Sequence, residues 1–272
     1  MDAVQARSIS ISELKVALEA FPRPAMLDLR DDVAFERDRT TIPGAIRCLP
    51  GAIAAAANHL EPWRRVVVIG AKGRDANEHA ARELQARGYD VAVLEGGFDR
   101  WQSERGAVRD FREPTKWVTR ERPKIDRIAC PWLVRRFIDA SAEFFYVPAR
   151  EVLAFAATHD AVPYDVPDVR YGHVGALCSF DAFVRIHAIA DPALDDVATI
   201  VRGADTGALN IAAQSAGLLA ISLGLSRMIG DDHAMLRWGM LVYDSLYAWR
   251  RDIRSQAHGL ERASALPAQG AA

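Results

Sequence analysis

Three short and mostly apolar runs, each followed by polar residues, divide the first hundred residues of the chain. They are Ala25–Leu29, Arg65–Ile69 and Asp90–Leu94. Runs of this length are typical of strands that are buried on both faces of a parallel sheet. Residues Asn77–Arg87 place alanines and a leucine on one side, and Gly88 follows them, as a glycine often follows a helix. The order strand, helix, strand predicts an α/β domain whose parallel sheet is flanked by helices on both faces.

A second pattern begins near residue 125, where apolar residues recur at helical spacing as far as Phe137. Pro131 interrupts this stripe, so the helix either kinks at the proline or begins there. The pattern then predicts a strand at Ala142–Val147, a helix at Ala149–Thr158 and short β pieces at 162–164 and 169–171. Four helices are expected after these, at Ser179–Ile189, Pro192–Gly203, Leu209–Leu225 and Asp231–Arg254. The second part of the chain is therefore predicted to be an α-rich domain with a small β element.

These patterns predict a domain at residues 8–106, a linker at 107–115, a second domain at 116–254 and a disordered tail at 255–272. The linker segment is short and charged and contains a proline. The tail has few residues to bury. The most apolar run, Leu209–Leu225, is broken by polar residues and is expected to be a buried helix rather than a membrane span.

The composition restricts the function classes. The chain has 272 residues, half of them hydrophobic, which is enough for two ordinary cores. Its formal net charge of −2 does not support DNA as a partner, because dedicated nucleic-acid binders are strongly basic. The three cysteines are odd in number and far apart, which is typical of free thiols in a reducing cytoplasm. The first residues show no secretory signal, so we expect a cytoplasmic protein with no membrane partner.

The positive charge is concentrated in one segment. Residues 109–136 contain nine basic and four acidic side chains, a balance of +5 within a chain of net charge −2. Such a segment is a candidate anion site or docking surface. The alternative is the solvated charged face of a buried helix.

Four pieces of the first domain resemble the rhodanese family: LDLRDDVAFERDRTTIPGAI at 27–46, VIGAKGRDA at 68–76, the helix that follows, and LEGGFDRW at 94–101. In that family a cysteine that carries sulfur ends the central strand and opens the following loop. Gly70 stands at this position here, and Thr41 stands where the family has a histidine. The resemblance implies the fold, while the missing nucleophile implies a catalytically dead domain with no catalytic residue.

The loop after the central strand keeps residues that could cradle an anion: Gly70, Ala71, Lys72, Gly73, Arg74 and Asp75. Backbone N–H groups and a helix N-terminus bind small oxyanions without any side chain. The alternative is a leftover scaffold that packs against the second domain and binds nothing. Cys48, after a short predicted strand, is expected to be a core residue.

The second domain resembles the ChrB family, the chromate-resistance domain, from about Lys116 to Trp249. The resemblance rests on four ordered blocks, RERPKIDRIACPWLVRRFIDASAEFFYVPA, HVGALCSFDAF, IVRGADTG and DDHAML. It implies a role in the response to chromate stress, because the family's regulators sense chromate and relieve repression of an efflux operon. Those regulators carry a different N-terminal region, credited with DNA binding, so sensing is the part that we expect to carry over.

Arg120, Arg127 and His173 make the candidate oxyanion site. A tetrahedral dianion such as chromate needs several fixed donors and a compensating positive charge, and arginine offers both. Asp126, next to Arg127, is expected to hold that guanidinium in position, and Cys130 is a further binding candidate beside it. Chromate, sulfate or a similar oxyanion is the predicted ligand.

His173 and Cys178, five residues apart, are also candidate metal ligands. A zinc site needs three or four protein ligands, and the sequence shows no fixed third, although Cys130, Asp165 and Asp205 could be recruited from a distance. Packing or hydrogen bonding by His173 is the alternative. Asp205 is interpreted first as a helix-break residue and second as a functional carboxylate. No cofactor is firmly implied; a divalent metal is the one candidate, and a homodimer stays open.

Three function classes follow. The first is a chromate-resistance protein that binds an oxyanion in its second domain and uses a dead rhodanese-like domain as a partner. The second is a sulfurtransferase-like or thiol-dependent enzyme that processes oxyanions, in which Cys130 or Cys178 supplies the thiol that Gly70 does not. The third is a chromate-responsive transcriptional regulator whose basic segment contacts DNA.

Overall fold

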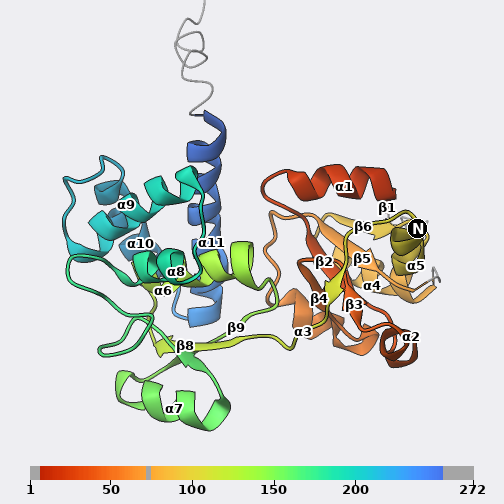
Figure 1. Cartoon of the computed structure of the whole chain (residues 1–272), viewed down its shortest axis with the longest axis horizontal. Coiled ribbons are helices and arrows are strands. Elements are labelled where there is room, and N and C mark those ends of the chain that lie inside the picture. Colours follow the sequence, from red (N-terminus) through yellow and green to blue (C-terminus); the bar gives the residue numbers. More distant parts are fainter. Residues whose placement is uncertain (1–6, 72–74, 254–272) are drawn as a thin grey trace, which may run out of the picture.

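The computed structural model describes residues 7–71 and 75–253. The disordered tail predicted at 255–272 lies outside these residues. Figure 1 shows an α/β lobe, drawn from red to yellow, beside a mostly helical lobe, drawn from green to blue. The predicted fold class is confirmed in both lobes.

The α/β lobe is built on five parallel strands in the order β1-β6-β5-β2-β4. Their bounds are β1 (Arg7–Ile9), β2 (Ala25–Asp28), β4 (Ala45–Arg47), β5 (Val66–Ile69) and β6 (Val91–Leu94). Successive residues of β5 alternate between two cores. Val66 and Val68 pack with α3 (Ile53–Ala57) and α4 (Asp75–Ala86), while Val67 and Ile69 pack with α1 (Ile11–Glu19) and α5 (Gly97–Ser103). Helices therefore cover both faces of the sheet, as the apolar runs predict.

The segment that was predicted as a linker is folded onto this lobe. β7 (Arg109–Asp110) pairs antiparallel with β3 (Thr40–Thr41), which follows α2 (Asp32–Arg37). The Trp101 Nε1–H also donates a hydrogen bond of 2.9 Å to the Ala107 carbonyl. Residues 107–115 are therefore held by backbone pairing and are more than a tether.

The helical lobe contains a second sheet of three parallel strands, with β8 (Lys116–Arg120) between β9 (Glu143–Val147) and β10 (Val162–Pro163). The sequence patterns did not predict β8, because it lies inside the basic segment. Between β8 and β9 run α6 (Ile125–Leu133) and a π-helical turn, η2 (Val134–Ile138). The alternative that the helix begins at Pro131 is wrong: Pro131 lies inside α6, just before the turn widens.

The remaining elements follow the predicted order: η3 (Ala149–Glu151), α7 (Val152–His159), α8 (Ser179–Ile186), α9 (Pro192–Thr206), α10 (Ser215–Met228), α11 (Asp232–Ala248) and η4 (Trp249–Ile253). A further short helix, η1 (Pro50–Ala52), precedes α3 in the first lobe.

α10 differs from the buried helix that was expected at Leu209–Leu225. It begins six residues later, and its inner side carries Ser215, Leu218, Ser222 and Ser226, whereas Ile221 and Met228 are exposed. At the start of α10, α9 passes so close that a Cβ on Gly203 would overlap the Ser215 side chain. Among the described helices, none is long and apolar enough to cross a membrane.

The two lobes meet through buried polar and aromatic side chains. Trp63 of the first lobe donates its Nε1–H to Asp244 of α11 at 3.2 Å, and its ring lies 6.0 Å from that of Trp238. Arg136 of η2 lies 3.3 Å from Glu61. The lobes therefore share an interface.

Candidate functional site

Four polar side chains from separate segments of the helical lobe meet at one place. Asp126 lies in the first turn of α6, Asp165 follows β10, His173 precedes α8, and Asp205 lies in the last turn of α9. The His173 Nε2 atom lies 3.6 Å from Asp126 Oδ2, 3.3 Å from Asp165 Oδ1 and 3.1 Å from Asp205 Oδ2. His173 is therefore at the centre of three carboxylates, and Asp205 is more than a helix-break residue.

The predicted arginine pair reaches the same place through Asp165. The Asp165 Oδ2 atom lies 2.9 Å from Arg120 Nη2 and 3.4 Å from Arg127 Nε. The structure thus brings Arg120, Arg127 and His173 together around a carboxylate that the sequence offered only as a distant recruit.

The expected partnership of Asp126 with Arg127 is wrong. Arg127 instead donates Nη1–H to the Glu121 carbonyl at 2.7 Å, besides its ion pair with Asp165. Adjacent residues of a helix point about 100° apart, so Asp126 and Arg127 cannot face each other.

Asp126 is the most buried member of the cluster, with 1% of its surface exposed. Its Oδ2 atom accepts hydrogen bonds from the backbone N–H groups of Ser179 at 2.5 Å and Phe180 at 3.3 Å, at the start of α8. Its Oδ1 atom is buried and has no hydrogen-bond partner within the described residues. One oxygen is therefore fixed by the helix N-terminus and the other is left unsatisfied.

The carboxylates also disturb one another. Burial raises the pKa of Asp126 well above its usual range, and the Asp205 and Asp165 carboxylates raise it further, while the Cys178 thiol and the Ser179 N–H oppose the rise. Burial and then Asp165 raise the pKa of Asp205, which the nearby His173 lowers in part. Crowded carboxylates of this kind disfavour their own charge unless a cation lies between them.

Asp126, His173 and Asp205 are the described residues that could hold a metal ion, since each offers one ligand atom and these atoms lie within 4.8 Å of one another. Cys178 is not part of this group. Its backbone N–H donates to Asp181 Oδ2 at 3.0 Å at the start of α8. Of the two predicted metal candidates, the geometry therefore keeps only His173.

The family described as "ChrB, C-terminal domain" matches residues 117–250, and the family described as "Rhodanese-like domain" matches residues 10–104. This chain carries a rhodanese-like domain followed by a ChrB C-terminal domain. Protein ChrB of Cupriavidus metallidurans is 30% identical over 184 residues, which cover 63% of this chain and 53% of that protein. The chain thus spans about half the length of this curated relative.

Two of the solved structures that are similar to this chain align with a little over a third of it. A rhodanese-related protein from Thermoplasma volcanium is 24% identical, with 38% of this chain and 97% of that chain covered and a TM-score of 0.33. A rhodanese-like domain protein from Staphylococcus aureus is 26% identical, with 35% and 90% covered and a TM-score of 0.32.

Within the rhodanese-like domain, Gly70 ends β5 where the family resemblance places the sulfur-carrying cysteine. A Cβ atom on Gly70 would overlap the side-chain amide of Asn77, a buried residue of α4. Of the predicted anion cradle, Lys72, Gly73, Arg74 and the side chain of Asp75 lie outside the described residues, so the cradle stays a prediction. No pattern in the sequence indicated that Asn77 would fill the space of the missing side chain.

The cysteines are buried in both domains. Cys130 and Cys178 have no exposed surface, and burial raises the pKa of both thiols, which nearby carboxylates raise further. Cys48 is also buried, as predicted for a core residue. A thiol nucleophile or thiolate ligand needs a lowered pKa and access, and these residues have neither.

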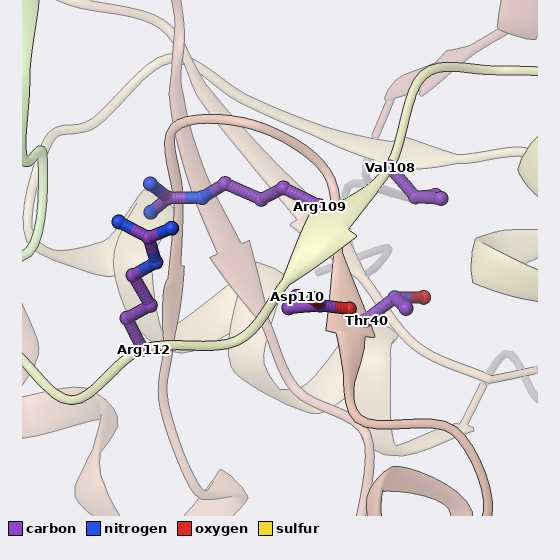
Figure 2. A pocket seen from close by; sticks show the side chains of 5 residues that line it. All are labelled: Thr40, Val108, Arg109, Asp110 and Arg112. Atoms are coloured by element: carbon purple, nitrogen blue, oxygen red, sulfur yellow. The ribbon is translucent and has the colours of Figure 1, made fainter.

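The basic segment does not form one surface. Arg109 and Arg112 line a cavity of about 510 Å³ beside β7, where their side chains extend toward one another (Figure 2). Arg122 donates to the Ser226 and Gly230 carbonyls before α11. Arg136 has 5% of its side chain exposed and pairs with Glu61 at the domain interface, and the half-buried Arg135 donates to the Ala142 carbonyl. The nine basic residues are therefore distributed over several separate places.

Proposed function

We propose that this chain is a chromate-resistance protein whose ChrB C-terminal domain binds a small oxyanion, such as chromate or sulfate, at Arg120, Arg127 and His173. One observation carries the proposal: two guanidiniums and one imidazole from three segments converge on Asp165, at 2.9, 3.4 and 3.3 Å. The link to chromate comes from the resemblance to the ChrB family, whose C-terminal domain matches residues 117–250.

Access and unused donor capacity support the same site. The side chains of Arg120 and His173 are 40% and 44% exposed, so a solute can reach them from solvent. The Arg120 Nε atom is buried without a hydrogen-bond partner in the described part of the chain, which leaves a donor for a ligand oxygen. Asp165 already forms ion pairs with both guanidiniums. An incoming dianion therefore competes with this carboxylate or binds together with a cation.

Titration of chromate and sulfate into single variants tests this function. A hydrogen bond to a charged group contributes about 1.5–3 kcal/mol, so Arg120→Ala and Arg127→Ala should each weaken binding by about ten- to a hundredfold. Arg120→Lys and Arg127→Lys should weaken binding less than the alanine variants do, because lysine keeps the positive charge but lacks the forked donor group of arginine. The matched control is Arg150→Ala, since Arg150 is 85% exposed and lies outside the cluster. Wild-type affinity in folded Arg120→Ala and Arg127→Ala would place the oxyanion elsewhere.

In this function the rhodanese-like domain has a structural role. The buried Asn77 occupies the space that a nucleophile at Gly70 would need, which supports a domain without sulfur transfer. Glu61 and Trp63 supply contacts to the ChrB C-terminal domain instead.

The two other function classes receive less support. A thiol-dependent enzyme is disfavoured because burial raises the pKa of the Cys130 and Cys178 thiols. A regulator that contacts DNA through the basic segment is disfavoured because Arg122 donates to the Ser226 carbonyl of α10, Arg135 donates to the Ala142 carbonyl and Arg136 is buried in an ion pair with Glu61.

A further inference from the structure

Three side chains of the cluster each offer one ligand atom, and these atoms lie close to one another. We infer that Asp126, His173 and Asp205 bind one divalent transition-metal ion in the ChrB C-terminal domain. Each side chain offers one ligand atom, these atoms lie within 4.8 Å of one another, and His173 Nε2 is 3.1 Å from Asp205 Oδ2. The Asp126 Oδ2 atom lies 3.6 Å from His173 Nε2, so this carboxylate adjoins the imidazole, and its Oδ1 atom is the oxygen left for an ion. Metal–nitrogen and metal–oxygen bonds of about 2.1 Å put neighbouring ligands about 3 Å apart and opposite ones about 4.2 Å apart.

The unsatisfied oxygen of Asp126 is an independent reason for an ion. Asp126 is 1% exposed, its Oδ2 atom is already bonded to two N–H groups of α8, and its buried Oδ1 atom has no partner within the residues that the structure covers. Buried carboxylate oxygens are normally paired, because leaving one unpaired in a low-dielectric interior is costly. A metal ion would supply the missing partner and would balance the neighbouring carboxylates at the same time.

The donor set indicates the class of ion. Two carboxylates and one imidazole suit Mn²⁺ or Fe²⁺ more than a sulfur-preferring ion, and the buried Cys130 and Cys178 thiols lie outside the group. Three protein ligands also leave coordination positions open for water or another oxygen ligand. Asp165 links the arginines to the proposed metal ligands, because it contacts both His173 and Arg120. An oxyanion could therefore complete the coordination sphere, a step that rests on the proposed function, whereas metal binding does not.

Metal binding can be measured directly on the full chain after treatment with a chelator. Mn²⁺ is the probe, followed by calorimetry and by loss of the free-ion signal in electron paramagnetic resonance, and Zn²⁺ is a second arm. We expect one ion per chain. Asp126→Asn, Asp205→Asn and His173→Ala should each weaken Mn²⁺ binding by at least about tenfold. Asp168→Asn and His159→Ala remove the same groups from exposed positions outside the cluster and should bind Mn²⁺ like the wild type.

Thermal melting separates lost ligands from lost folding. Without metal, Asp126→Asn should melt at or above the wild-type temperature, because it removes one of three crowded carboxylates. At a hundredfold excess over its Kd, Mn²⁺ should raise the wild-type melting temperature by about 5 °C or more and should leave that of Asp126→Asn unchanged. An equal shift in both proteins would overturn the assignment, and so would the absence of both Mn²⁺ and Zn²⁺ binding to the wild type.

Sulfate titrations with and without Mn²⁺ distinguish this inference from the proposed function. If Mn²⁺ binds and no oxyanion binds, the metal site stands and the oxyanion function falls. If an oxyanion binds equally well to chelated wild type and to Asp205→Asn, and Mn²⁺ does not bind, the function stands and the metal site falls. Arg120→Gln should keep Mn²⁺ binding and lose oxyanion affinity.

Discussion

Arg136 of the ChrB C-terminal domain lies 3.3 Å from Glu61 of the rhodanese-like domain, and both side chains are almost fully buried. Arg136 also holds Asp244 at 2.9 Å, and Glu61 also holds Arg64 at 2.8 Å. This chain of charges crosses the domain interface. Removing either partner of such a buried ion pair lowers the stability of the fold much more than the intact pair raises it.

The first prediction is that Glu61 makes stability depend on acid pH. Burial alone would raise the pKa of Glu61, but Arg136, Arg64 and Arg135 outweigh burial and lower it to about 2. Because the folded pKa is below the unfolded value of about 4.5, the stabilisation is fully present above pH 4.5 and is lost as the pH falls toward 2. It amounts to about 3 kcal/mol.

Glu61→Gln should therefore lower the melting temperature at pH 7 by about 5–10 °C, and the difference from wild type should shrink as the pH falls from 4.5 toward 2. Glu36→Gln is the control, because Glu36 pairs with Arg39 at an exposed position. A difference that stays constant with pH would mean that packing, rather than charge, accounts for the loss.

The second prediction concerns the linker, which should resist limited proteolysis. β7 pairs with β3, the Phe111 N–H donates to the Arg39 carbonyl at 2.8 Å, and the Phe111 ring lies 5.0 Å from that of Phe35. Trypsin needs extended backbone, so cleavage at Arg109 and Arg112 requires this pairing to open first.

Phe111→Ala should increase the rate of trypsin cleavage in the linker by about tenfold, since it removes the ring contact that holds the segment. Exposed sites such as Arg150 serve as the internal reference for protease activity. Rapid cleavage of the wild-type linker would show that β7 is not stably paired.

The third prediction is that the rhodanese-like loop needs two changes to hold a reactive thiol. The wild type should show no thiosulfate:cyanide sulfurtransferase activity above background. Gly70→Cys alone forces its Cβ into Asn77 and should mainly destabilise the domain. Gly70→Cys with Asn77→Ala makes room, and the thiol at the loop should then alkylate faster near neutral pH than the native cysteines do, because loop N–H groups favour the thiolate.

Mass spectrometry after thiosulfate treatment checks sulfur uptake by the double variant, with Asn77→Ala as its control. If the folded double variant takes up no sulfur and alkylates no faster than that control, the loop lacks the predicted cradle.

The fourth prediction is that the native thiols are inert. Cys130 and Cys178 have no exposed surface, so a thiol reagent can reach them only after local unfolding. Their modification in the native protein should be at least about a hundredfold slower than in denaturant. Cys178→Ala should keep oxyanion affinity within about twofold of the wild type. Loss of binding in this variant, if it remains folded, would revive a thiol-dependent function.

The sequence predicted more of the fold than of the site. Strands β2, β5 and β6 were found because each is buried on both faces and is therefore mostly apolar, with Asp28 at the end of β2 as the exception. β8 was missed since Lys116 and Arg120 at its ends obscure a buried centre. In the site, Arg120, Arg127 and His173 were predicted from the segments that resemble the ChrB family.

The role of Asp165 could not be predicted in the same way. Its backbone has a positive φ of 51°, and its position depends on Ser179, whose Oγ–H donates to Asp165 Oδ1 at 2.9 Å. Asp126 and Asp205 were likewise brought to His173 only by the packing of α6, α8 and α9. Side chains that meet from distant segments leave no spacing in a single sequence that could reveal them.

The last prediction turns on Asp165, which competes with any bare anion for the arginines. Its Oδ2 atom lies 2.9 Å from Arg120 Nη2 and 3.4 Å from Arg127 Nε, so it neutralises much of the charge that a dianion would need. Asp165→Asn removes that charge and keeps a side chain of the same size. If the arginines bind oxyanions directly, this variant should bind sulfate about tenfold more tightly than the wild type in chelator, as expected when a competing charge-assisted bond is lost. Asp168→Asn, three residues away and exposed, controls for the general loss of one negative charge. If Asp165→Asn weakens sulfate binding as much as Arg120→Ala does, the carboxylate positions the arginines instead of competing with the ligand. Direct competition at this site would then be wrong.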